Sequence, residues 1–290
     1  MSCEGLYLVE PAGRKFRMML HVTKVYAVEK SPYQEVMLVE LEGFGRALVI
    51  DNFVQSTELD EYLYHELLVH PPMIVHPAPS RILIIGGGEG ATLREVLKHA
   101  TVKEAVMVDI DSVVVEFSKK YLEYMHQGSF NDPRARVVIM DGARYVREAP
   151  SGYFDVVLMD LTDPYAGDAA KPLYSEDFYR EVKRVLRENG VIATQAGSSY
   201  FYPREYDYVL ENVKKVFKYI VEYDTWIPSF GLNVNFIVAS DAFNPGLITP
   251  EEFDARLAAR NVKVKYINGR RYKGLIDKGI TRPASSIYFE

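Results

Sequence analysis

A glycine-rich turn that carries an acidic side chain is the first place where residue types in this chain point to chemistry. Residues 82–85 are apolar, residues 86–90 read Gly-Gly-Gly-Glu-Gly, and residues 91–97 have helical spacing. In an α/β fold such a turn lets a ligand contact bare backbone. The charge of Glu89 would repel the phosphates that most of these turns bind at a helix N-terminus. The turn therefore favours a cationic ligand, although Gly86, Gly88 and Ala91 alone would also suit a dinucleotide enzyme or a packing turn.

Three further acids follow predicted strands. Asp109 closes the next apolar stretch, where an acid can accept hydrogen bonds from the two hydroxyls of a ribose. Asp141 ends another strand and could accept a hydrogen bond from an adenine amino group, and Asp160 ends a fourth. Each acid taken singly is more simply a helix cap or a surface residue. Because the carboxyl ends of parallel strands share one edge of a sheet, the set predicts a pocket for a nucleoside with a positively charged tail.

Composition limits the class of protein. The 290 residues are 48% hydrophobic and carry a net charge of −6 without long charged runs, which favours a globular protein with no nucleic-acid partner. The single Cys3 excludes an internal disulfide framework and a cysteine-based zinc site, and it suits a reducing, cytoplasmic location. No run approaches the roughly 18 apolar residues of a membrane helix, and residues 1–5 lack a signal-peptide pattern. We therefore expect no membrane partner.

The elements that must position these acids fall into two groups. Residues 16–28, 35–41 and 46–50, with a turn at 43–45, predict a small antiparallel sheet, and a helix follows from Glu58 to about His70, ended by Pro71 and Pro72. Seven further strands alternate with helical stretches and predict a mainly parallel sheet covered by helices; they are 81–85, 104–109, 135–140, 154–160, 190–195, 217–223 and 234–239.

The C-terminal tail contains one predicted helix. It spans Thr249 to Ala259, with Thr249 as its N-cap and Glu251 and Glu252 in the first turn. The basic stretch from Lys263 to Arg271 is interpreted as a solvated surface.

Several segments together resemble the polyamine aminopropyltransferases, the spermidine synthase family. The segments are 31–34, 55–66, 86–90, 109–111, 141–142 and 160–164, so the resemblance covers roughly residues 15–240. It implies a Rossmann-like, methyltransferase-type seven-strand α/β domain with a small N-terminal antiparallel β domain, divided here as residues 1–66 and 67–290. It also implies decarboxylated S-adenosylmethionine as aminopropyl donor, a polyamine as acceptor, no further cofactor, and a homodimer or homotetramer.

The charge of Glu89 suits this donor. Decarboxylated S-adenosylmethionine has a sulfonium and an ammonium but no carboxylate, so Glu89 would attract it and disfavour ordinary S-adenosylmethionine. A charge contact near 4 Å is worth about 4 kcal/mol at an effective dielectric of about 20, before desolvation is subtracted. By resemblance, Asp109 and Gln34 would hold the ribose and Asp141 the adenine amino group. The full donor set is Gln34, His65, Gly86, Gly88, Glu89, Asp109, Asp141 and Gly142.

The reaction implied is displacement at the carbon beside the sulfonium by an amine. The amine must be neutral to attack, whereas a free alkylamine titrates near about 10. By resemblance, Asp160 accepts that proton or orients the amine, with Tyr64 beside it. An ordinary aspartate is a weak base, so we expect most of the rate to come from alignment and desolvation. The acceptor set is Tyr64, Asp160, Asp163, Gln195 and Phe230, although Tyr64 could equally be a core aromatic residue.

Two departures from the spermidine synthases concern the substrates. Those enzymes carry an aspartate at the position of Glu89, and a tyrosine at the position of Phe230, which cannot hydrogen-bond a diamine. Together with residues 194–197 and the longer loop 165–172, these features are more similar to thermospermine synthases, which extend a triamine. The alternative is that putrescine is still the acceptor.

Other interpretations remain open on the sequence. A methyltransferase would share the fold and the ribose acid, but it binds a donor carboxylate that Glu89 opposes. A non-catalytic polyamine-binding protein would keep the acidic pocket. His65 and Glu66 begin a pattern like that of a zinc-protease helix, but Val69 stands where the second histidine is needed, so no metal site is predicted.

Overall fold

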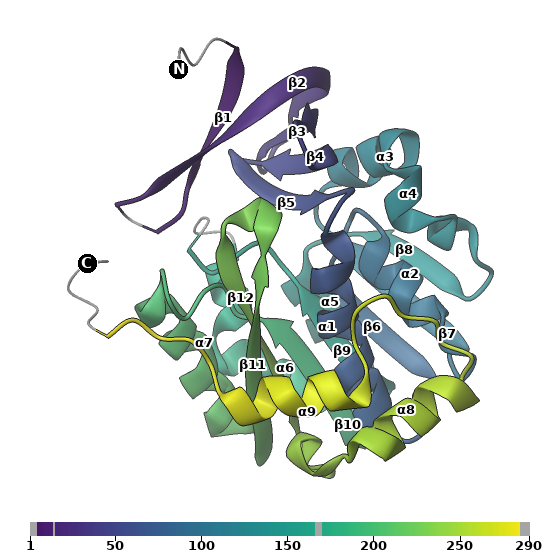
Figure 1. Cartoon of the computed structure of the whole chain (residues 1–290). Coiled ribbons are helices and arrows are strands. Elements are labelled where there is room, and N and C mark those ends of the chain that lie inside the picture. Colours follow the sequence, from purple (N-terminus) through teal and green to yellow (C-terminus); the bar gives the residue numbers. More distant parts are fainter. Residues whose placement is uncertain (1–4, 14, 166–169, 285–290) are drawn as a thin grey trace.

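The fold is taken from a computed structural model that describes residues 5–13, 15–165 and 170–284 (Figure 1). Cys3 and residues 166–169 of the loop 165–172 lie outside the described residues. Within the described ranges, no helix has both the length and the apolar character needed to cross a bilayer.

The N-terminal part is a five-stranded antiparallel sheet in the order β1-β2-β3-β4-β5. Its strands are β1 (Leu6–Pro11), β2 (Arg17–Lys30), β3 (Glu35–Leu41), β4 (Gly45–Ile50) and β5 (Phe53–Thr57). The three predicted strands correspond to β2, β3 and β4, whereas β1 and β5 were not predicted. The inner strands are buried on both faces, because Val39 and Val49 pack within the sheet while Leu38 and Leu48 pack against the second domain.

The second sheet has seven strands in the order β11-β12-β10-β9-β6-β7-β8. They are β6 (Arg81–Gly86), β7 (Glu104–Asp109), β8 (Ala135–Ile139), β9 (Phe154–Asp160), β10 (Leu186–Gln195), β11 (Tyr219–Ile227) and β12 (Leu232–Ser240). All seven predicted strands are confirmed, with shifted ends. The sheet is mixed rather than purely parallel, because β12 runs antiparallel to both β10 and β11.

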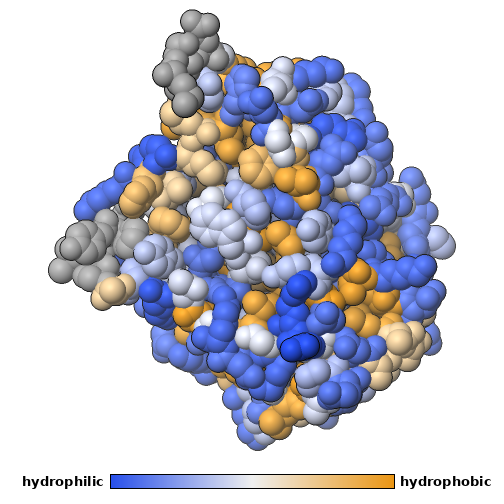
Figure 2. All heavy atoms as spheres, viewed as in Figure 1, coloured by the Kyte–Doolittle hydropathy of each residue, from blue (hydrophilic) through white to orange (hydrophobic). Residues whose placement is uncertain are grey.

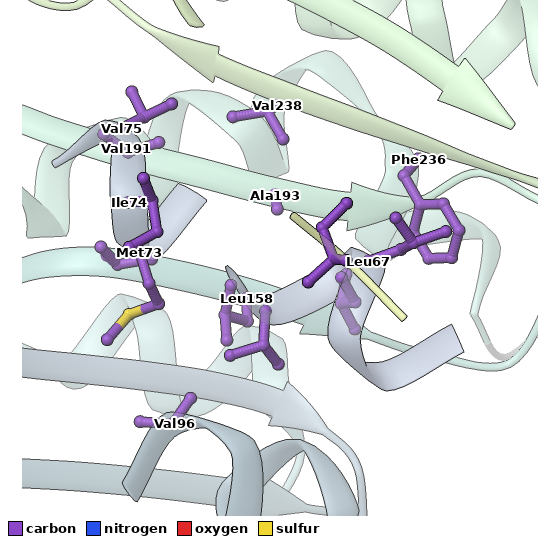
Figure 3. Close-up of a cluster of buried hydrophobic side chains, with 14 of the residues drawn as sticks. Leu67, Met73, Ile74, Val75, Val96, Leu158, Val191, Ala193, Phe236 and Val238 are labelled. Carbon is purple, nitrogen blue, oxygen red and sulfur yellow. The ribbon is translucent and has the colours of Figure 1, made fainter. Parts of the chain in front are cut away.

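Helices cover both faces of this sheet, and the strands alternate their side chains between two apolar layers. Ile82 and Ile84 belong to one layer, and Leu83 and Ile85 to the other. The first layer also receives Leu67 and other residues of α1, as Figure 3 shows. The layer is completed by α1 (Glu61–Val75), α2 (Ala91–Leu97), α8 (Pro250–Ala259) and α9 (Gly269–Lys278), and the opposite layer by α5 (Gly142–Glu148), α6 (Glu176–Val185) and α7 (Pro203–Val216). Two further helices, α3 (Ser112–Tyr121) and α4 (Glu123–His126), face the N-terminal sheet.

Helix α1 corrects one prediction, because it continues through Pro71 and Pro72 and ends at Val75. A proline inside a helix normally leaves the carbonyl four residues earlier without its hydrogen bond. Here the Tyr223 hydroxyl donates to the Leu67 carbonyl at 2.8 Å, which replaces the bond that Pro71 cannot make. The helix also begins at Glu61 rather than at residue 58, so the predicted domain boundary after residue 66 falls inside it. That boundary stays a prediction.

The C-terminal tail corrects a second prediction. Thr249 caps α8 as expected, by accepting a hydrogen bond from the Glu252 N–H at 3.1 Å. The following stretch is not simply solvated, because the buried Glu66 carboxylate accepts hydrogen bonds from the backbone N–H groups of residues 265, 266 and 267. A further helix, α9, then packs Tyr272 against Phe253 with ring centroids 5.2 Å apart. The basic side chains still face outward, but the backbone that carries them is anchored.

Candidate active site

A cavity of about 200 Å³ lies at the carboxyl ends of the parallel strands, under the N-terminal sheet. It lies at a topological switch point, because the chain runs from β6 to β7 and β8 on one side and from β9 to β10 on the other. All but one of the predicted site residues line it; the lining members are Gln34, Tyr64, Gly86, Gly88, Glu89, Asp109, Asp141, Gly142, Asp160, Asp163, Gln195 and Phe230. His65 does not line the cavity.

The polar residues stand in a row that follows the strand order. Asp141 follows β8, Asp109 ends β7, Glu89 follows β6, Asp160 ends β9 and Gln195 ends β10, and these strands are consecutive neighbours in the sheet. With about 4.8 Å between neighbouring strands, the row extends over roughly 19 Å. The cavity is therefore elongated along the sheet edge, with acids distributed along it.

Glycine is required in this turn because the neighbouring strand ends lie too close for a side chain. A Cβ atom at Gly86 would lie 2.0 Å from the Asp160 carbonyl oxygen, and one at Gly88 would lie 2.6 Å from Asp109 Oδ2. Gly86 also has a φ of 85°, which favours glycine. The turn thus brings bare backbone and the Glu89 side chain to the floor of the cavity, as its sequence predicts.

Asp109, the acid predicted to hold a ribose, is buried at the end of β7 and lines the cavity. Burial raises its pKa to about 7, the N–H of Asp111 partly offsets this by donating to Oδ1 at 2.8 Å, and the charge of Glu89 adds to the increase. Gln34 reaches the same region from the N-terminal sheet, and its Nε2 donates to Asp111 Oδ2 at 2.9 Å. Asp111 therefore links the two predicted ribose ligands, a role that the sequence did not reveal because Asp111 also caps α3.

Asp141 caps a helix and also lines the cavity. Its Oδ1 accepts a hydrogen bond from the Arg144 N–H at 2.7 Å and so caps α5. The residue is exposed and lines the end of the cavity near β8. One carboxylate oxygen therefore remains for a ligand.

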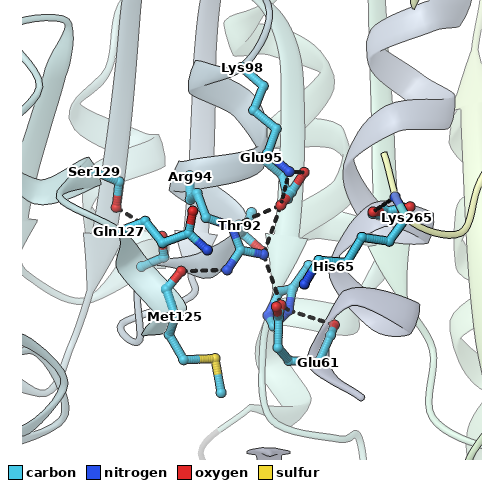
Figure 4. Close-up of polar contacts among 12 residues, drawn as sticks. Glu61, His65, Thr92, Arg94, Glu95, Lys98, Met125, Gln127, Ser129 and Lys265 are labelled. Atoms are coloured by element: carbon cyan, nitrogen blue, oxygen red, sulfur yellow. Dashed lines mark hydrogen bonds and ion pairs between the residues drawn. The ribbon is translucent and has the colours of Figure 1, made fainter. Parts of the chain in front are cut away.

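His65 lies between the carboxylates of Glu61 and Glu89. Its Nε2 is 2.8 Å from Glu89 Oε1, and its Nδ1 is 2.8 Å from Glu61 Oε2. Figure 4 shows His65 beside Glu61. Burial alone would lower the pKa of His65, but the hydrogen bonds and charges of Glu61 and Glu89 raise it to about 10. The ring is therefore an imidazolium, and Glu89 already has a cationic neighbour before any ligand binds.

The protonated ring also bears on metal binding. Among the described residues, His65, Glu89 and Asp160 offer ligand atoms within 4.8 Å of one another. Both nitrogens of an imidazolium are donors and have no lone pair for a metal. The chemistry of this cluster consequently opposes metal coordination.

Buried charges on α2 extend the cluster away from the cavity (Figure 4). Arg94 Nη2 lies 2.8 Å from Glu61 Oε2 and 2.7 Å from Glu95 Oε1. Glu95 Oε2 lies 3.0 Å from His70 Nε2 and 2.6 Å from the partly exposed Lys98 Nζ. Sequence reasoning missed this chain, because charged residues on a short helix pattern are ordinarily solvated.

Asp160 is held by two hydroxyls. The Tyr64 hydroxyl donates to Oδ1 at 2.7 Å, and the Thr92 hydroxyl donates to Oδ2 at 2.6 Å. Burial and the charge of Glu89 raise the pKa of Asp160 to about 6, against the opposing charge of His65 and the two hydrogen bonds. Burial raises the pKa of Tyr64 well above its usual value, so the phenol stays protonated and donates. Tyr64 is thus a cavity-lining donor as well as an aromatic core residue.

Phe230 lies beside Tyr64, with ring centroids 6.3 Å apart and an edge-to-face arrangement. It belongs to the short helix η3 (Pro228–Phe230) between β11 and β12. Asp60, just before α1, accepts hydrogen bonds from the Ser229 N–H and hydroxyl, both at 2.8 Å. This anchor fixes the apolar ring of Phe230 against the cavity.

Both polar atoms of the Gln195 side chain make hydrogen bonds within the protein. Its Nε2 donates to the Leu161 carbonyl at 2.6 Å and to the Tyr174 hydroxyl at 2.7 Å, and its Oε1 accepts from the Gly197 N–H at 2.7 Å. It therefore holds the segment that carries Asp163. Burial raises the pKa of Asp163 to about 6.

Glu10 on β1 is a buried acid that sequence reasoning missed. It is 4% exposed, and its Oε2 accepts a hydrogen bond from the Val54 N–H at 3.2 Å. Burial raises its pKa to about 9, and the nearby charge of Asp163 adds to the increase. No sequence signal distinguishes Glu10, because β1 itself was not predicted.

Comparison with known proteins follows the same outline. A family model described as spermine/spermidine synthase domain matches residues 61–246, and one described as spermidine synthase tetramerisation domain matches residues 9–58. The polyamine aminopropyltransferase of Pyrobaculum calidifontis is 51% identical over 277 residues, covering 95% of this chain and 96% of that protein. Polyamine aminopropyltransferase 1 of Hyperthermus butylicus is 48% identical over 276 residues, covering 94% of each.

Two solved structures are similar throughout. A spermidine synthase in complex with the transition-state analogue AdoDATO has a TM-score of 0.88 and 31% identity, covering 95% of this chain and 93% of that chain. The spermidine synthase from Thermotoga maritima has a TM-score of 0.86 and 31% identity, covering 95% and 92%. These similarities favour an aminopropyltransferase over the methyltransferase and the non-catalytic polyamine-binding protein. The chain therefore belongs to the spermidine synthase family and is an aminopropyltransferase.

Proposed function

We propose that this enzyme transfers the aminopropyl group of decarboxylated S-adenosylmethionine to a terminal amine of a polyamine and releases 5′-methylthioadenosine. Spermidine is the favoured acceptor, giving thermospermine or spermine, and putrescine is the second candidate. The observation that carries the proposal is the row of acids along one elongated cavity, from Asp141 through Asp109, Glu89 and Asp160 to Asp163.

In this proposal, each part of the donor lies beside a different acid of the row. Adenine would lie near Asp141, the ribose hydroxyls would donate to Asp109, and the sulfonium and aminopropyl tail would pass Glu89 toward Asp160. Gln34 would complete the ribose site from the N-terminal sheet. This order supports a donor with a cationic tail, since the acids beyond the ribose would repel a donor carboxylate.

The attacking amine would lie at Asp160. As the amine attacks the propyl carbon beside sulfur, a C–N bond forms, the C–S bond breaks, and the electron pair stays on sulfur as a neutral thioether. The amine proton passes to Asp160, whose raised pKa of about 6 makes it a better base than an ordinary aspartate. The Tyr64 hydroxyl holds Oδ1 in place, and the burial of the site favours the neutral amine.

Two features support a triamine acceptor. The apolar ring of Phe230 borders the cavity next to Tyr64, where it suits the methylenes of a long chain. Glu10 does not line the cavity, but its carboxyl interacts electrostatically with that of Asp163 and has a pKa of about 9, so an ammonium bound near Asp163 would stabilise its ionised form. A diamine would have fewer groups to place along this path.

The acceptor is tested by incubating the enzyme with decarboxylated S-adenosylmethionine and putrescine, spermidine or norspermidine, followed by chromatography and mass analysis. We expect a gain of one aminopropyl unit, with the highest kcat/KM for spermidine. S-adenosylmethionine as donor is the matched control and should give no product. Absence of transfer to every amine would contradict the function, and a higher kcat/KM for putrescine would contradict only the acceptor.

The Phe230→Tyr variant tests the acceptor site itself. A tyrosine hydroxyl could accept a hydrogen bond from a diamine ammonium, so we expect the ratio of kcat/KM for putrescine to that for spermidine to rise by about tenfold. The KM for the donor should stay unchanged. An unaltered ratio would remove Phe230 from the acceptor site.

We also propose that the N-terminal sheet joins copies of this chain into a homodimer or homotetramer in the predicted cytoplasmic location. Val9 on β1 and Met19 on β2 are cross-strand partners and are 48% and 54% exposed. Hydrophobic side chains gather over this sheet in Figure 2. An exposed apolar area on a sheet is typical of an interface.

A further inference from the structure

Thr92 is a buried hydroxyl that contacts the reacting end of the site without lining the cavity. It is the second residue of α2, is 0% exposed, and donates to Asp160 Oδ2 at 2.6 Å. Together with Tyr64 on Oδ1, it gives each carboxylate oxygen of Asp160 one hydroxyl donor from a different helix. Hydroxyl–carboxylate bonds of this length belong to the stronger class of protein hydrogen bonds.

The surroundings leave Asp160 little freedom. Its carbonyl oxygen accepts a hydrogen bond from the Gly87 N–H at 3.0 Å. A Cβ atom at Gly87 would lie 2.9 Å from Oδ2, so the glycine turn closes that side of the carboxylate. Tyr64, on the other side, packs against Phe236 with ring centroids 5.4 Å apart. The Thr92 hydroxyl thus completes a cradle that sets the orientation of the carboxylate.

We propose that Thr92 is a positioning residue for aminopropyl transfer, acting through Asp160 by holding its carboxylate oriented and ionised in the unliganded site. This rests on the proposed role of Asp160 as the group that accepts the amine proton. Hydrogen bonds to an ionised carboxylate favour that form. The direction of this effect agrees with the contribution of Thr92, which lowers the pKa of Asp160 against the raising effect of burial.

The other groups that face Asp160 also change its pKa, some in the same direction as Thr92 and one against it. Glu89 in the glycine turn raises the pKa of Asp160, while His65 and Tyr64 on α1 lower it. Tyr174, in the short helix η2 (Lys171–Tyr174), interacts electrostatically with Asp160 but stays neutral, because burial raises its own pKa well above the usual value. The Thr92 bond therefore acts in the same direction as His65 and Tyr64 and opposes Glu89.

The Thr92→Val variant tests the proposal, with Thr92→Ser as its matched control. Valine keeps the volume and β-branching but removes the donor, whereas serine keeps the donor. In profiles of kcat/KM for the acceptor against pH, we expect the acidic limb of the valine variant to move up by about one pH unit. We also expect kcat at neutral pH to fall about tenfold, as loss of a hydrogen bond to a charged group implies. The serine variant should stay close to the wild type, and the donor KM should change less than about twofold in both.

Three outcomes separate the alternatives. An acidic limb that stays in place in Thr92→Val, or that moves equally in Thr92→Ser, would overturn the role of Thr92 and assign it to packing alone. In an Asp160→Asn background, a further tenfold loss caused by Thr92→Val would also overturn it, because the effect must pass through Asp160. A wild type that transfers no aminopropyl group would instead refute the proposed function.

Should Thr92→Val fail to fold, Thr92→Cys provides the same comparison, because a thiol is a weak donor of similar size. We expect the acidic limb of the cysteine variant to lie at higher pH than those of the serine variant and the wild type. An acidic limb identical to that of Thr92→Ser would contradict the proposal.

Discussion

At the scale of single residues, two aspartates of the site differ in the hydrogen-bond partners that surround them. Asp109 and Asp160 both end strands of the same sheet, and burial raises the pKa of both. Asp109 receives backbone hydrogen bonds, whereas Asp160 receives two side-chain hydroxyls. The first arrangement suits a fixed ligand contact, and the second suits a group whose orientation and protonation matter for a reaction.

Substitutions of the two aspartates are therefore expected to affect different steps, catalysis for Asp160 and donor binding for Asp109. Asp160→Asn removes the proton acceptor and should lower kcat at least about a hundredfold while the Kd of the donor stays within about threefold. Asp109→Ala removes a ribose contact and should weaken donor binding by about ten- to a hundredfold. Calorimetric titration with 5′-methylthioadenosine and steady-state kinetics measure both effects. The reverse pattern would refute the assigned roles.

The acidic limb of the activity profile is a second expectation at this scale. Asp160 must be ionised to accept the amine proton, and its pKa is raised to about 6, so activity should rise with pH through that value. The neutral fraction of the free amine rises over the same range and adds to the slope. A rate that does not change between about pH 5 and about pH 7 would contradict the role of Asp160.

At the scale of elements, α1 and α2 are joined by buried charges as well as by apolar packing. Glu61 on α1 lies between His65 and Arg94, with both contacts at 2.8 Å. Burial raises the pKa of Glu61, but these two cations together lower it to about 2. Losing one carboxylate from such a buried set leaves His65 and Arg94 insufficiently compensated.

Glu61→Gln should accordingly lower the free energy of unfolding by about 2–4 kcal/mol. It should also lower the pKa of His65, because one of its two carboxylate partners is lost. Chemical denaturation and an NMR titration of the imidazole measure the two effects. The matched control is Glu148→Gln, which breaks an exposed pair with Arg144 on α5 and should change stability by less than about 0.5 kcal/mol. Equal losses in both variants would contradict the buried network.

At the scale of the whole molecule, burial raises the pKa of several acids and so favours their protonated forms. The effect is large for Glu10, whose pKa is raised from 4.5 to about 9. A raised pKa means that the folded state holds the proton more tightly. The stability contributed by the protonated group is therefore fully present below pH 4.5 and is lost as pH rises toward 9.

Glu10→Gln should flatten this dependence. Between about pH 5 and pH 8 we expect the wild type to lose on the order of 4 kcal/mol more unfolding free energy than the variant. Guanidinium denaturation at both pH values and at one protein concentration measures the difference. Glu29→Gln, on the exposed end of β2, is the control and should leave the pH dependence as in the wild type. Parallel curves for wild type and Glu10→Gln would contradict the burial of an uncharged acid.

Assembly is also a property of the whole molecule. Met19→Lys places a charge in the exposed apolar face of the N-terminal sheet, so we expect it to shift the enzyme from oligomer to monomer. Sedimentation velocity measures the shift. Leu247→Lys, at a site that is 75% exposed on the far domain, is the control and should not change the assembly. A monomeric wild type would refute the proposed interface.

The sequence allowed much of the fold and site to be predicted, because its signals were local. Strands of the large sheet are continuous apolar runs, and the acids at their ends occur next to glycine or helix starts, as Glu89 and Asp141 do. The prediction failed where a distant residue changed a local rule. Pro71 does not end α1, because the Tyr223 hydroxyl donates a hydrogen bond to the free carbonyl. The basic stretch is not simply a solvated surface, because Glu66 accepts hydrogen bonds from its backbone.

What the sequence by itself determined was the seven-strand α/β architecture, the aminopropyltransferase family and the acids at the strand ends that line the cavity, since strand patterns and turn motifs are short-range features. Only the tertiary structure decided how those residues are charged and held. His65 lies behind Glu89 as an imidazolium, Thr92 reaches Asp160, and Glu10 is buried near Asp163. The physical reason is that hydrogen-bond partners and pKa values depend on burial and on neighbours from separate elements, which no local pattern specifies.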